Sequence, residues 1–447
     1  MIRNGRRFAF AASLLATFAA GATAHASPED LFSYGTRSPA MGGIGAATAQ
    51  GYEAAYQNPA LLSMVSRRKL TLGIAGAAFT LHTDGDAARG MVQADAAKGV
   101  IIGAETPIPF GGFLRNRVGF GLAFYTPTAL VVRGRILYPE TPQYPLLPDR
   151  AQSVTLRVGL GLDIGYGLRL GVGFAALAEI AGQVTVATDA TGRVGARVED
   201  QLVATYAPTF GVSYTKRVTS KNTVALGLAF RGKLDARFSV LIDATRFSSL
   251  SLPRFNIAGL AQYDPAQLTL EGAWIRQERV LGISLTYKRW SRYPGQLAPT
   301  ILCPPDEPDC GALSPPKADY SDTVVVRVGA EQRVLRSRVL ALRLRAGAFL
   351  EPTPLSADLP SSAAFDRGSK TVVQVPTRYF DATRLGLTWG VGLTFAKFPL
   401  DFDLYGQYQA LLPRELTFAA GGPNGATATS TASGHVLAFG LSTGVKF

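Results

Sequence analysis

The C-terminal stretch of the chain alternates between two kinds of side chain. Leu437, Phe439 and Leu441 fall on one parity, and small or polar residues such as Gly440 and Ser442 fall on the other. Because successive side chains of a β-strand point to opposite faces, this pattern predicts a strand with one apolar face. That apolar face needs a partner, which is either the core of a soluble protein or the lipid of a membrane.

The same alternation recurs along most of the chain, with turns between the segments. We identify fourteen such segments from Lys69 onward, and an even number fits a bacterial β-barrel. The segments are 69–83, 99–110, 116–133, 151–168, 169–187, 196–217, 222–245, 263–274, 276–292, 320–335, 338–351, 382–397, 398–418 and 433–447. The longer connections, at 134–150, 246–262, 293–319, 352–381 and 419–432, are rich in Pro, Gly or Ser and are expected to lie outside the cell.

Apolar and charged residues separate onto the two faces of these segments. Leu387 lies on the apolar parity of its segment, whereas Arg384 lies on the other. An Arg on the lipid face costs roughly 2–4 kcal/mol at the midplane, so the charges are expected to point into the lumen. Tyr287, Trp290 and Tyr293 near one segment end are typical of an aromatic girdle at the membrane interface.

The N-terminus has the features of a secretory signal peptide. Arg3, Arg6 and Arg7 precede the apolar run Phe8–Ala20, and Ala24–Ala26 gives an A-x-A cleavage site. The run is too short to span a bilayer as a helix, which needs about 20 residues. We therefore expect export of the chain and removal of the signal after Ala26.

Composition agrees with a membrane barrel. No later window approaches about 18 uncharged apolar residues, and a membrane protein without spanning helices must be a closed barrel. Only 17% of residues are charged, against about 25% in soluble domains, which disfavours a secreted soluble β-protein. The formal charge is +13, or 13 − 3 = +10 without the three arginines of the signal, and the remaining Lys and Arg residues are scattered singly. A solvated lumen or a rim facing lipopolysaccharide explains this charge better than nucleic acid does. The predicted fold is an all-β transmembrane barrel.

The region before the first segment has no alternation and is expected to fill the barrel. It contains the glycine cluster Met41–Gly45 and the motif Asn58–Ala60. A phosphate-binding loop is a poor interpretation, because no strand precedes the glycines and no Lys-Ser/Thr follows them. A barrel of this strand number is wide enough to hold a plug. The expected domains are a signal peptide at 1–26, a hatch (plug) at 27–67 and a barrel at 68–447.

The two cysteines, Cys303 and Cys310, lie close together in a Pro-rich loop. An exported chain matures in an oxidising compartment, so a disulfide is favoured over a metal site, which would need more ligands. The only histidines are His25, His82 and His435, and no Gly-x-Ser-x-Gly motif is present. We expect neither an enzyme, nor a metal, nor a cofactor.

Several of these stretches resemble one family. Gly35–Ala49 followed by Tyr52–Ala60 is similar to the N-terminal hatch of the FadL/OmpP1/TodX outer-membrane transporters of long-chain fatty acids and hydrocarbons. The chain departs from the family at Leu61-Leu62, where Gly is usual, and at Thr128-Ala129-Leu130, where Phe-Gly-Leu is typical. Ending on Phe447 resembles the signal read by the barrel-assembly machinery. Further similar stretches are Val118–Pro127, Pro265–Leu270, Leu285–Ser291, Leu344–Pro354 and Phe380–Arg384.

The resemblance implies a fourteen-stranded barrel that releases its ligand sideways, through a gap beside a kinked third strand. In this chain the kink is expected at Tyr125, Thr126 and Pro127, since proline removes a hydrogen bond from the strand ladder. The alternative is that Pro127 simply ends the pairing.

Two further sets of residues are candidates for the site. Asn58, Pro59 and Ala60 would anchor the hatch near the kink, and the alternative is an ordinary Asn-Pro turn. Arginines on the lumen face can bind a fatty-acid carboxylate in bidentate fashion. The alternative is that acids such as Asp163, Asp401 or Asp403 neutralise them. The arginine candidates are Arg157, Arg343, Arg345 and Arg384.

The predicted function is passive uptake of hydrophobic molecules across the outer membrane of a Gram-negative bacterium. Long-chain fatty acids are the leading substrate, and aromatic hydrocarbons and other lipophiles are alternative substrates. The expected partners are outer-membrane lipid, lipopolysaccharide and a hydrophobic ligand, with a monomeric chain. One alternative is a protein-interaction subunit of a secretion apparatus, and the second is a general porin.

Overall fold

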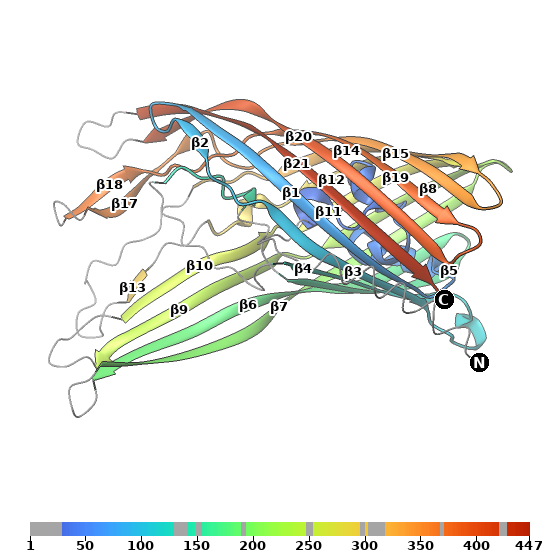
Figure 1. Ribbon diagram of the computed structural model, residues 1–447, viewed down its shortest axis with the longest axis horizontal. Helices are drawn as coiled ribbons and strands as arrows, with labels where there is room; N and C mark the ends of the chain where they lie inside the picture. The colour runs from blue at the N-terminus through green and yellow to red at the C-terminus, as the bar shows by residue number, and fades with distance from the viewer. Residues whose placement is uncertain are drawn as a thin grey trace.

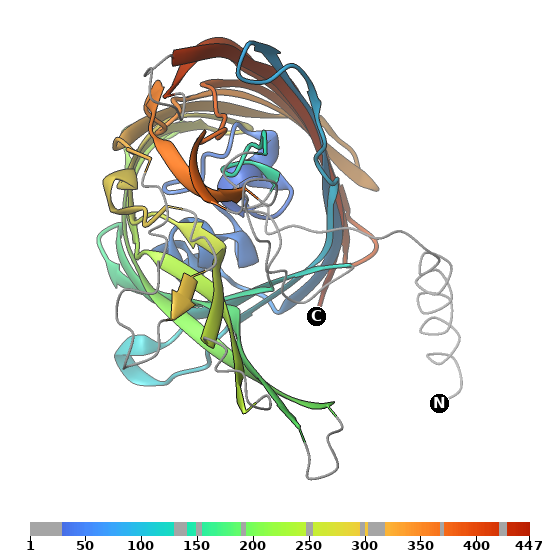
Figure 2. The ribbon, with the colours of Figure 1, turned by 90° about the vertical axis from the view of Figure 1, so that its left-hand side faces the viewer.

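The barrel closes because its first and last strands pair. β1 (Lys69–Gly85) runs antiparallel to β21 (Thr427–Lys446), with Lys69 opposite Lys446. Figures 1 and 2 show the resulting closed wall, with short helices inside it. This computed structural model describes residues 29–128, 141–148, 154–188, 194–246, 254–295, 300–302, 318–366, 371–419 and 427–447.

Fourteen antiparallel strands form the wall, and each corresponds to one of the fourteen predicted segments. The predicted fold class is therefore confirmed. The strands in order are β1, β3 (Ala97–Pro107), β4 (Val118–Pro127), β5 (Thr155–Gly165), β6 (Leu168–Thr188), β7 (Val194–Arg217), β8 (Asn222–Arg231), β11 (Gln267–Arg276), β12 (Arg279–Lys288), β14 (Thr323–Arg336), β15 (Leu340–Glu351), β19 (Arg384–Phe395), β20 (Leu400–Ala419) and β21.

The two ends of the barrel differ. Brief connections join β3 to β4, β5 to β6, β7 to β8, β11 to β12, β14 to β15 and β19 to β20 at one end, called here the short-turn end. The C-terminus lies at this end (Figure 1). The opposite, long-loop end carries shorter strands within its connections. These are β2 (Gly90–Val92), β13 (Thr300–Leu302), β16 (Asp358–Leu359), β17 (Ser361–Asp366) and β18 (Thr371–Pro376).

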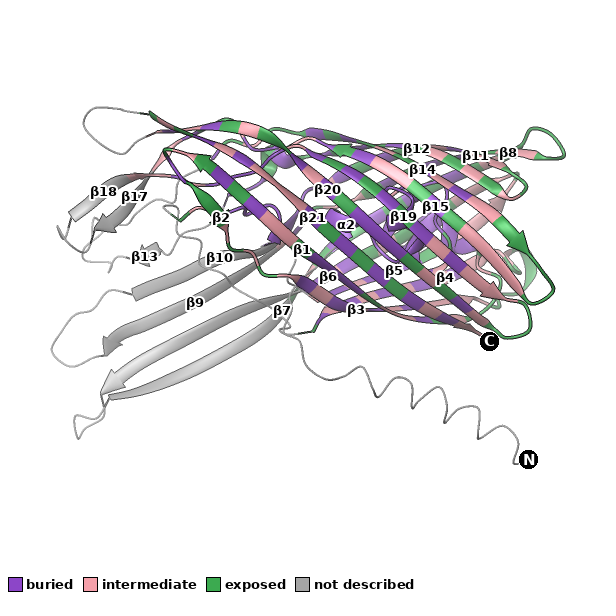
Figure 3. Cartoon of the chain, turned by 45° about the horizontal axis from the view of Figure 1, so that its top comes forward, coloured by how far each residue is buried: buried purple, intermediate pink, exposed green. Residues whose placement is uncertain are grey.

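The wall alternates between buried and exposed residues along its strands (Figure 3). Leu387 and Trp389 on β19, for example, are 57% and 54% exposed, as their parity predicted. The predicted aromatic girdle is wrong for Trp290 and Tyr293, which are both buried. After β12 the chain turns through η5 (Trp290–Arg292), and both rings pack against Tyr263.

A leaf of four strands extends beyond the barrel at the long-loop end (Figure 1). It consists of the ends of β6 and β7 with β9 (Leu234–Arg246) and β10 (Arg254–Asp264), and β9 runs parallel to β6. The predicted single segment 222–245 is therefore two strands, and the predicted loop 246–262 contains β10. The division falls at Gly232, whose N–H donates to the Pro208 carbonyl at 2.8 Å.

The N-terminal residues 29–64, called here the hatch, form short helical turns inside the barrel (Figure 2). No helix of the described residues is both long and apolar enough to cross a membrane. The hatch contains α2 (Glu29–Phe32), α3 (Arg37–Ala40), η1 (Gly51–Glu53), α4 (Ala54–Gln57) and η2 (Pro59–Met64), and nearly all of its residues are buried.

The outward face of the wall can be tested with one charge. Leu270 lies within β11 and is 54% exposed, so Leu270→Arg is expected to lower the free energy of unfolding by about 2–4 kcal/mol in vesicles. Val218→Arg, in the turn between β7 and β8, is the control and should change it little. Urea titration of both refolded variants measures the difference. Equal losses would contradict a lipid-facing Leu270.

Candidate functional site: the hatch inside the barrel

Asn58 fixes the start of η2 against the rest of the hatch and the wall. Its side-chain Oδ1 accepts a hydrogen bond from the Ala60 N–H at 3.1 Å, and Pro59 occupies the first turn, where a missing N–H costs nothing. The Asn58 amide donates to the Ala46 carbonyl at 2.6 Å and to the Val212 carbonyl of β7 at 3.0 Å. Asn58 is fully buried, and its hydrogen bonds to the Ala46 and Val212 carbonyls go beyond those of an ordinary Asn-Pro turn.

The wall beneath η2 is built from glycines, which allow the hatch backbone to touch it. A Cβ at Gly171 would lie 2.0 Å from the Ala60 nitrogen, and one at Gly211 would lie 1.9 Å from the Asn58 Oδ1. Any side chain here would therefore push η2 away from the wall. The other glycines in contact with η2 are Gly119, Gly121, Gly159 and Gly161.

Three carboxylates hold backbone N–H groups of the hatch, and one of them, Glu105 of β3, accepts from the Tyr52 N–H at 2.6 Å. Glu271 of β11 accepts from the Gly45 and Ala46 N–H groups, both at 2.6 Å, and from the Thr48 hydroxyl at 2.7 Å. Within the hatch, Glu53 accepts from the N–H groups at the start of α3, including that of Arg37 at 2.8 Å. Hydrogen bonds to an ionised acceptor are stronger than neutral ones.

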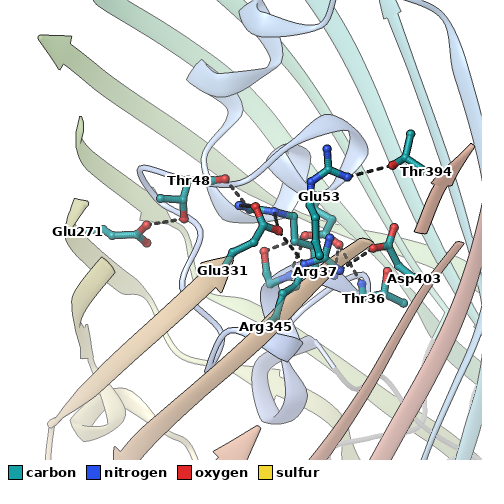
Figure 4. A network of polar contacts seen from close by, with 11 residues as sticks. Thr36, Arg37, Thr48, Glu53, Glu271, Glu331, Arg345, Thr394 and Asp403 are labelled. Carbon is teal, nitrogen blue, oxygen red and sulfur yellow. Dashed lines mark hydrogen bonds and ion pairs between the residues drawn. The ribbon is translucent and has the colours of Figure 1, made fainter. Parts of the chain in front are cut away.

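A chain of buried ions joins the hatch to β14, β15 and β20 (Figure 4). Arg37 of the hatch donates to Glu331 through Nε at 3.0 Å and Nη2 at 3.2 Å. Arg345 donates to the same carboxylate at 2.7 Å and to Asp403 at 2.5 Å. Because Glu331 lies between two guanidinium groups, the hatch is fixed to this side of the wall by charge.

A second chain of ions joins the hatch to β12, β15 and β19. Lys288 is fully buried and donates to Asp30 of the hatch at 2.9 Å and to Glu351 at 2.7 Å. Arg384 contacts the same Glu351 at 2.9 Å. In addition, Glu29 of the hatch pairs with Arg157 of β5.

Three of the four candidate arginines are thus neutralised by acids, as the alternative interpretation held. Arg157 pairs with Glu29, Arg345 with Glu331 and Asp403, and Arg384 with Glu351. Of the three acids proposed as partners, Asp403 is the one that neutralises a candidate arginine. Asp401 instead pairs with Lys69 and Lys446, and Asp163 with Arg169. Arg343 forms no ion pair with the described acids, and its Nη1 donates to the Thr394 hydroxyl at 2.9 Å.

An apolar cluster, called here the lumen core, fills the space between the hatch and the long-loop end. Its larger members are Leu31, Phe32, Tyr34, Tyr52, Tyr56, Leu61 and Leu62 of the hatch, Leu81, Ile101, Tyr125, Leu411, Leu416, Phe418 and Val436 of the wall, and Tyr144, Leu147, Leu355, Leu359, Tyr379 and Phe380 of the connections. The Tyr144 hydroxyl donates to the His82 carbonyl at 2.6 Å, which ties one connection to β1. Burial raises the pKa of this phenol, so it stays a donor.

The predicted kink lies at the end of β4, the third wall strand. β4 pairs with β3 without a register shift as far as Pro127 opposite Gly99, and with β5 as far as Tyr125 opposite Thr155. The regular pairing matches the alternative, in which Pro127 ends the ladder. The kink at Tyr125, Thr126 and Pro127 stays a prediction, because residues 129–140 lie outside the described part of the chain.

Other predicted features also lie outside the described residues. These are the signal peptide with its cleavage site after Ala26 and the proposed disulfide between Cys303 and Cys310. Among residues that are described, no three His, Cys, Asp or Glu side chains gather in a way that could hold a metal ion.

The glycine wall gives a test of hatch docking. Gly171→Ala places a methyl group against the Ala60 backbone, and overpacking of this kind costs about 1–3 kcal/mol. We expect a lower unfolding temperature and faster proteolysis of the hatch. Gly272→Ala on β11 is the matched control, because its nearest neighbour would be 3.8 Å away. Similar behaviour of the two variants would show that η2 does not press on the wall.

The ion chain gives a second test. Glu331→Gln leaves two buried guanidinium groups poorly compensated, so stability should fall by about 3–5 kcal/mol. Glu278→Gln breaks the more exposed pair with Arg333 and should cost about 1 kcal/mol or less. Denaturant titration of both variants measures the contrast. Equal stability losses would contradict the role given to Glu331.

Solved structures share this fold over nearly the whole chain. The chain superposes on a Pseudomonas aeruginosa FadL homologue with a TM-score of 0.59 and 16% identity, covering 96% of this chain and 99% of that one. The Pseudomonas putida toluene transporter TodX gives 0.58 and 14%, with 94% and 99% covered. The Ralstonia pickettii toluene transporter TbuX gives 0.52 and 15%, also with 94% and 99% covered.

No family model and no curated protein matches the sequence. At these identities the structural likeness establishes the fold, and it confirms the predicted resemblance at that level. The chain has the FadL-type fold, a closed fourteen-stranded barrel with helical turns of an N-terminal hatch inside it.

Proposed function

We propose that the chain spans the outer membrane of a Gram-negative bacterium and carries hydrophobic molecules inward without catalysis. The outward apolar face of the wall supports a lipid environment, in which closed barrels are one of two viable spanning structures. The likeness to a FadL homologue and to two toluene transporters supports hydrophobic cargo. In this proposal the short-turn end faces the periplasm, as is usual for such barrels.

The lumen core is the single observation that carries the proposal. It runs without interruption from the connections at the long-loop end to the aromatic residues of the hatch, including Tyr34, Tyr52 and Tyr56. A lipophile that displaces some of these side chains exchanges one apolar contact for another. Long-chain fatty acids are the substrate class that we propose to test first, and toluene is the comparison.

The exit that we propose is sideways through the wall, because the hatch is bound too firmly to leave. Ion pairs and hydrogen bonds connect it to strands on all sides of the barrel, through residues such as Asp30, Arg37 and Asn58. We place this exit beside β4, whose described pairing with β3 ends at Pro127, a residue that cannot donate a hydrogen bond to the strand ladder. Asn58, Pro59 and Ala60 would hold the hatch beneath this opening.

The leaf formed by β6, β7, β9 and β10 supports a second candidate function. A sheet that projects beyond the membrane is a surface on which a partner protein can dock, as in a component of a secretion apparatus. Removing residues 180–200 and 236–262 should abolish such an interaction and leave uptake intact. Loss of uptake alone would assign the leaf to ligand capture.

The proposed uptake can be tested with two matched substitutions. Val436 on β21 belongs to the lumen core, and Val325 on β14 is equally buried but lies outside it. Val436→Asn puts an amide in the path of the lipophile, and a buried polar group without a partner costs about 1–3 kcal/mol. We expect uptake of labelled oleate to fall about fivefold or more for Val436→Asn and to persist for Val325→Asn.

Lipids that co-purify with the detergent-extracted protein should include fatty acids by mass spectrometry. An empty barrel whose cells take up neither oleate nor toluene would contradict the transport proposal and favour the protein-interaction role. Toluene uptake without oleate uptake would confine the cargo to hydrocarbons.

A further inference from the structure

A polar cavity lies between the hatch and the wall at the short-turn end. Its volume is about 210 Å³, and it shares only Ala49 with the lumen core. Its lining includes the exposed residues Gln50, Met64 and Gln277, so it is open to solvent at the short-turn end. A ligand can therefore reach the cavity without passing through the hatch.

The charges that line this cavity do not balance. It is lined by three arginines and two glutamates. Arg37 is paired with Glu331, and Arg333 is paired with Glu278 at 2.8 Å. Arg343 has no partner among the described acids, and only the Thr394 hydroxyl, 2.9 Å from its Nη1, accepts from it. One positive charge is therefore left over, at the cavity wall.

We propose that this cavity binds a small carboxylate with a single negative charge, and that Arg343 is its direct ligand. A guanidinium presents parallel N–H groups that match the two oxygens of a carboxylate. One excess positive charge matches a monoanion better than a dianion. The cavity is smaller than the 300–1,000 Å³ of pockets that enclose drug-sized ligands, so the ligand has a short chain.

The inference is independent of lipophile uptake through the lumen core, since the two sites use different residues. Thr394 is a positioning residue here, because its hydroxyl orients the Arg343 side chain. Alanines at positions 47 and 49 and Ile275 supply apolar contacts for the short chain of the ligand.

The test uses the full-length protein in detergent and chloride-free buffer. The probe is [1-¹³C]acetate, and broadening of its NMR line measures binding. Arg343→Gln should weaken acetate binding about tenfold, because a charge-assisted contact is lost. Thr394→Val should weaken acetate binding about threefold. This second variant keeps the proposal testable if Arg343→Gln does not fold. Arg338→Gln, an exposed arginine in the turn between β14 and β15, is the control and should bind as the unaltered protein does.

Unchanged binding in both Arg343→Gln and Thr394→Val would overturn the proposal. An equal loss in Arg338→Gln would overturn it too, because general surface charge would then explain binding. Phosphate that binds more tightly than acetate would contradict the assignment to a carboxylate. Acetate binding that persists while oleate uptake fails would leave this site standing and overturn only the transport proposal.

Discussion

The contact between the hatch backbone and glycines of the wall is the interaction on which the rest of the structure depends. Below η2, Gly171 and Gly211 leave space for backbone and side-chain atoms that a Cβ would occupy. On the opposite side, a Cβ at Gly347 would lie 2.2 Å from the Gly42 nitrogen, and one at Gly329 would lie 2.3 Å from the Met41 carbonyl oxygen. The hatch is therefore seated directly on the wall, and its polar backbone finds partners there.

This seating explains why so many ions lie inside the barrel. A buried ion pair contributes little net stability, but removal of one partner is costly, so such pairs specify a position more than they stabilise a fold. Asp30, Arg37 and Glu29 each find their counter-ion on a different part of the wall. Together they define one orientation of the hatch. Ions held in this way are not available to a ligand, which leaves Arg343 as the exception among the four candidate arginines.

Charge and apolar surface are also separated within the lumen. The lumen core lies mainly against β1, β3, β4, β20 and β21 and the connections at the long-loop end, whereas the ion chain around Glu331 joins the hatch to β14 and β15. A lipophile entering from outside therefore meets apolar side chains first. The proposed sideways exit avoids the ion chain around Glu331, which a hydrophobic molecule would cross only at high cost.

Much of the fold could be predicted from the sequence, because strand alternation in a barrel wall is a local pattern. For this reason the side chains of Leu387 and Trp389 lie on the outward face of the wall, as predicted. The division of β8 from β9 could not be predicted, since both strands alternate and only Gly232 and Lys233 separate them. The path of β9 to the side of β6 depends on tertiary pairing.

The site was harder to predict than the fold. Lumen-facing arginines could be identified by parity, but their partners come from strands and hatch turns that meet only in the closed barrel. Glu331 and Glu351, on the lumen parity of their strands, were the signal that could have indicated neutralisation. Trp290 and Tyr293 were misplaced because the inward turn after β12 has no local signature.

In the proposed mechanism, the hatch stays docked while a lipophile passes through the wall. Thr36 of the hatch and Ser442 of β21 have their hydroxyl oxygens 2.8 Å apart, so Thr36→Cys with Ser442→Cys can lock the hatch in place, in a background where Cys303 and Cys310 are Ser. We predict equal oleate uptake by cells carrying the oxidised and the reduced protein. Uptake that stops on oxidation and returns on reduction would contradict the account, because the hatch would then have to move.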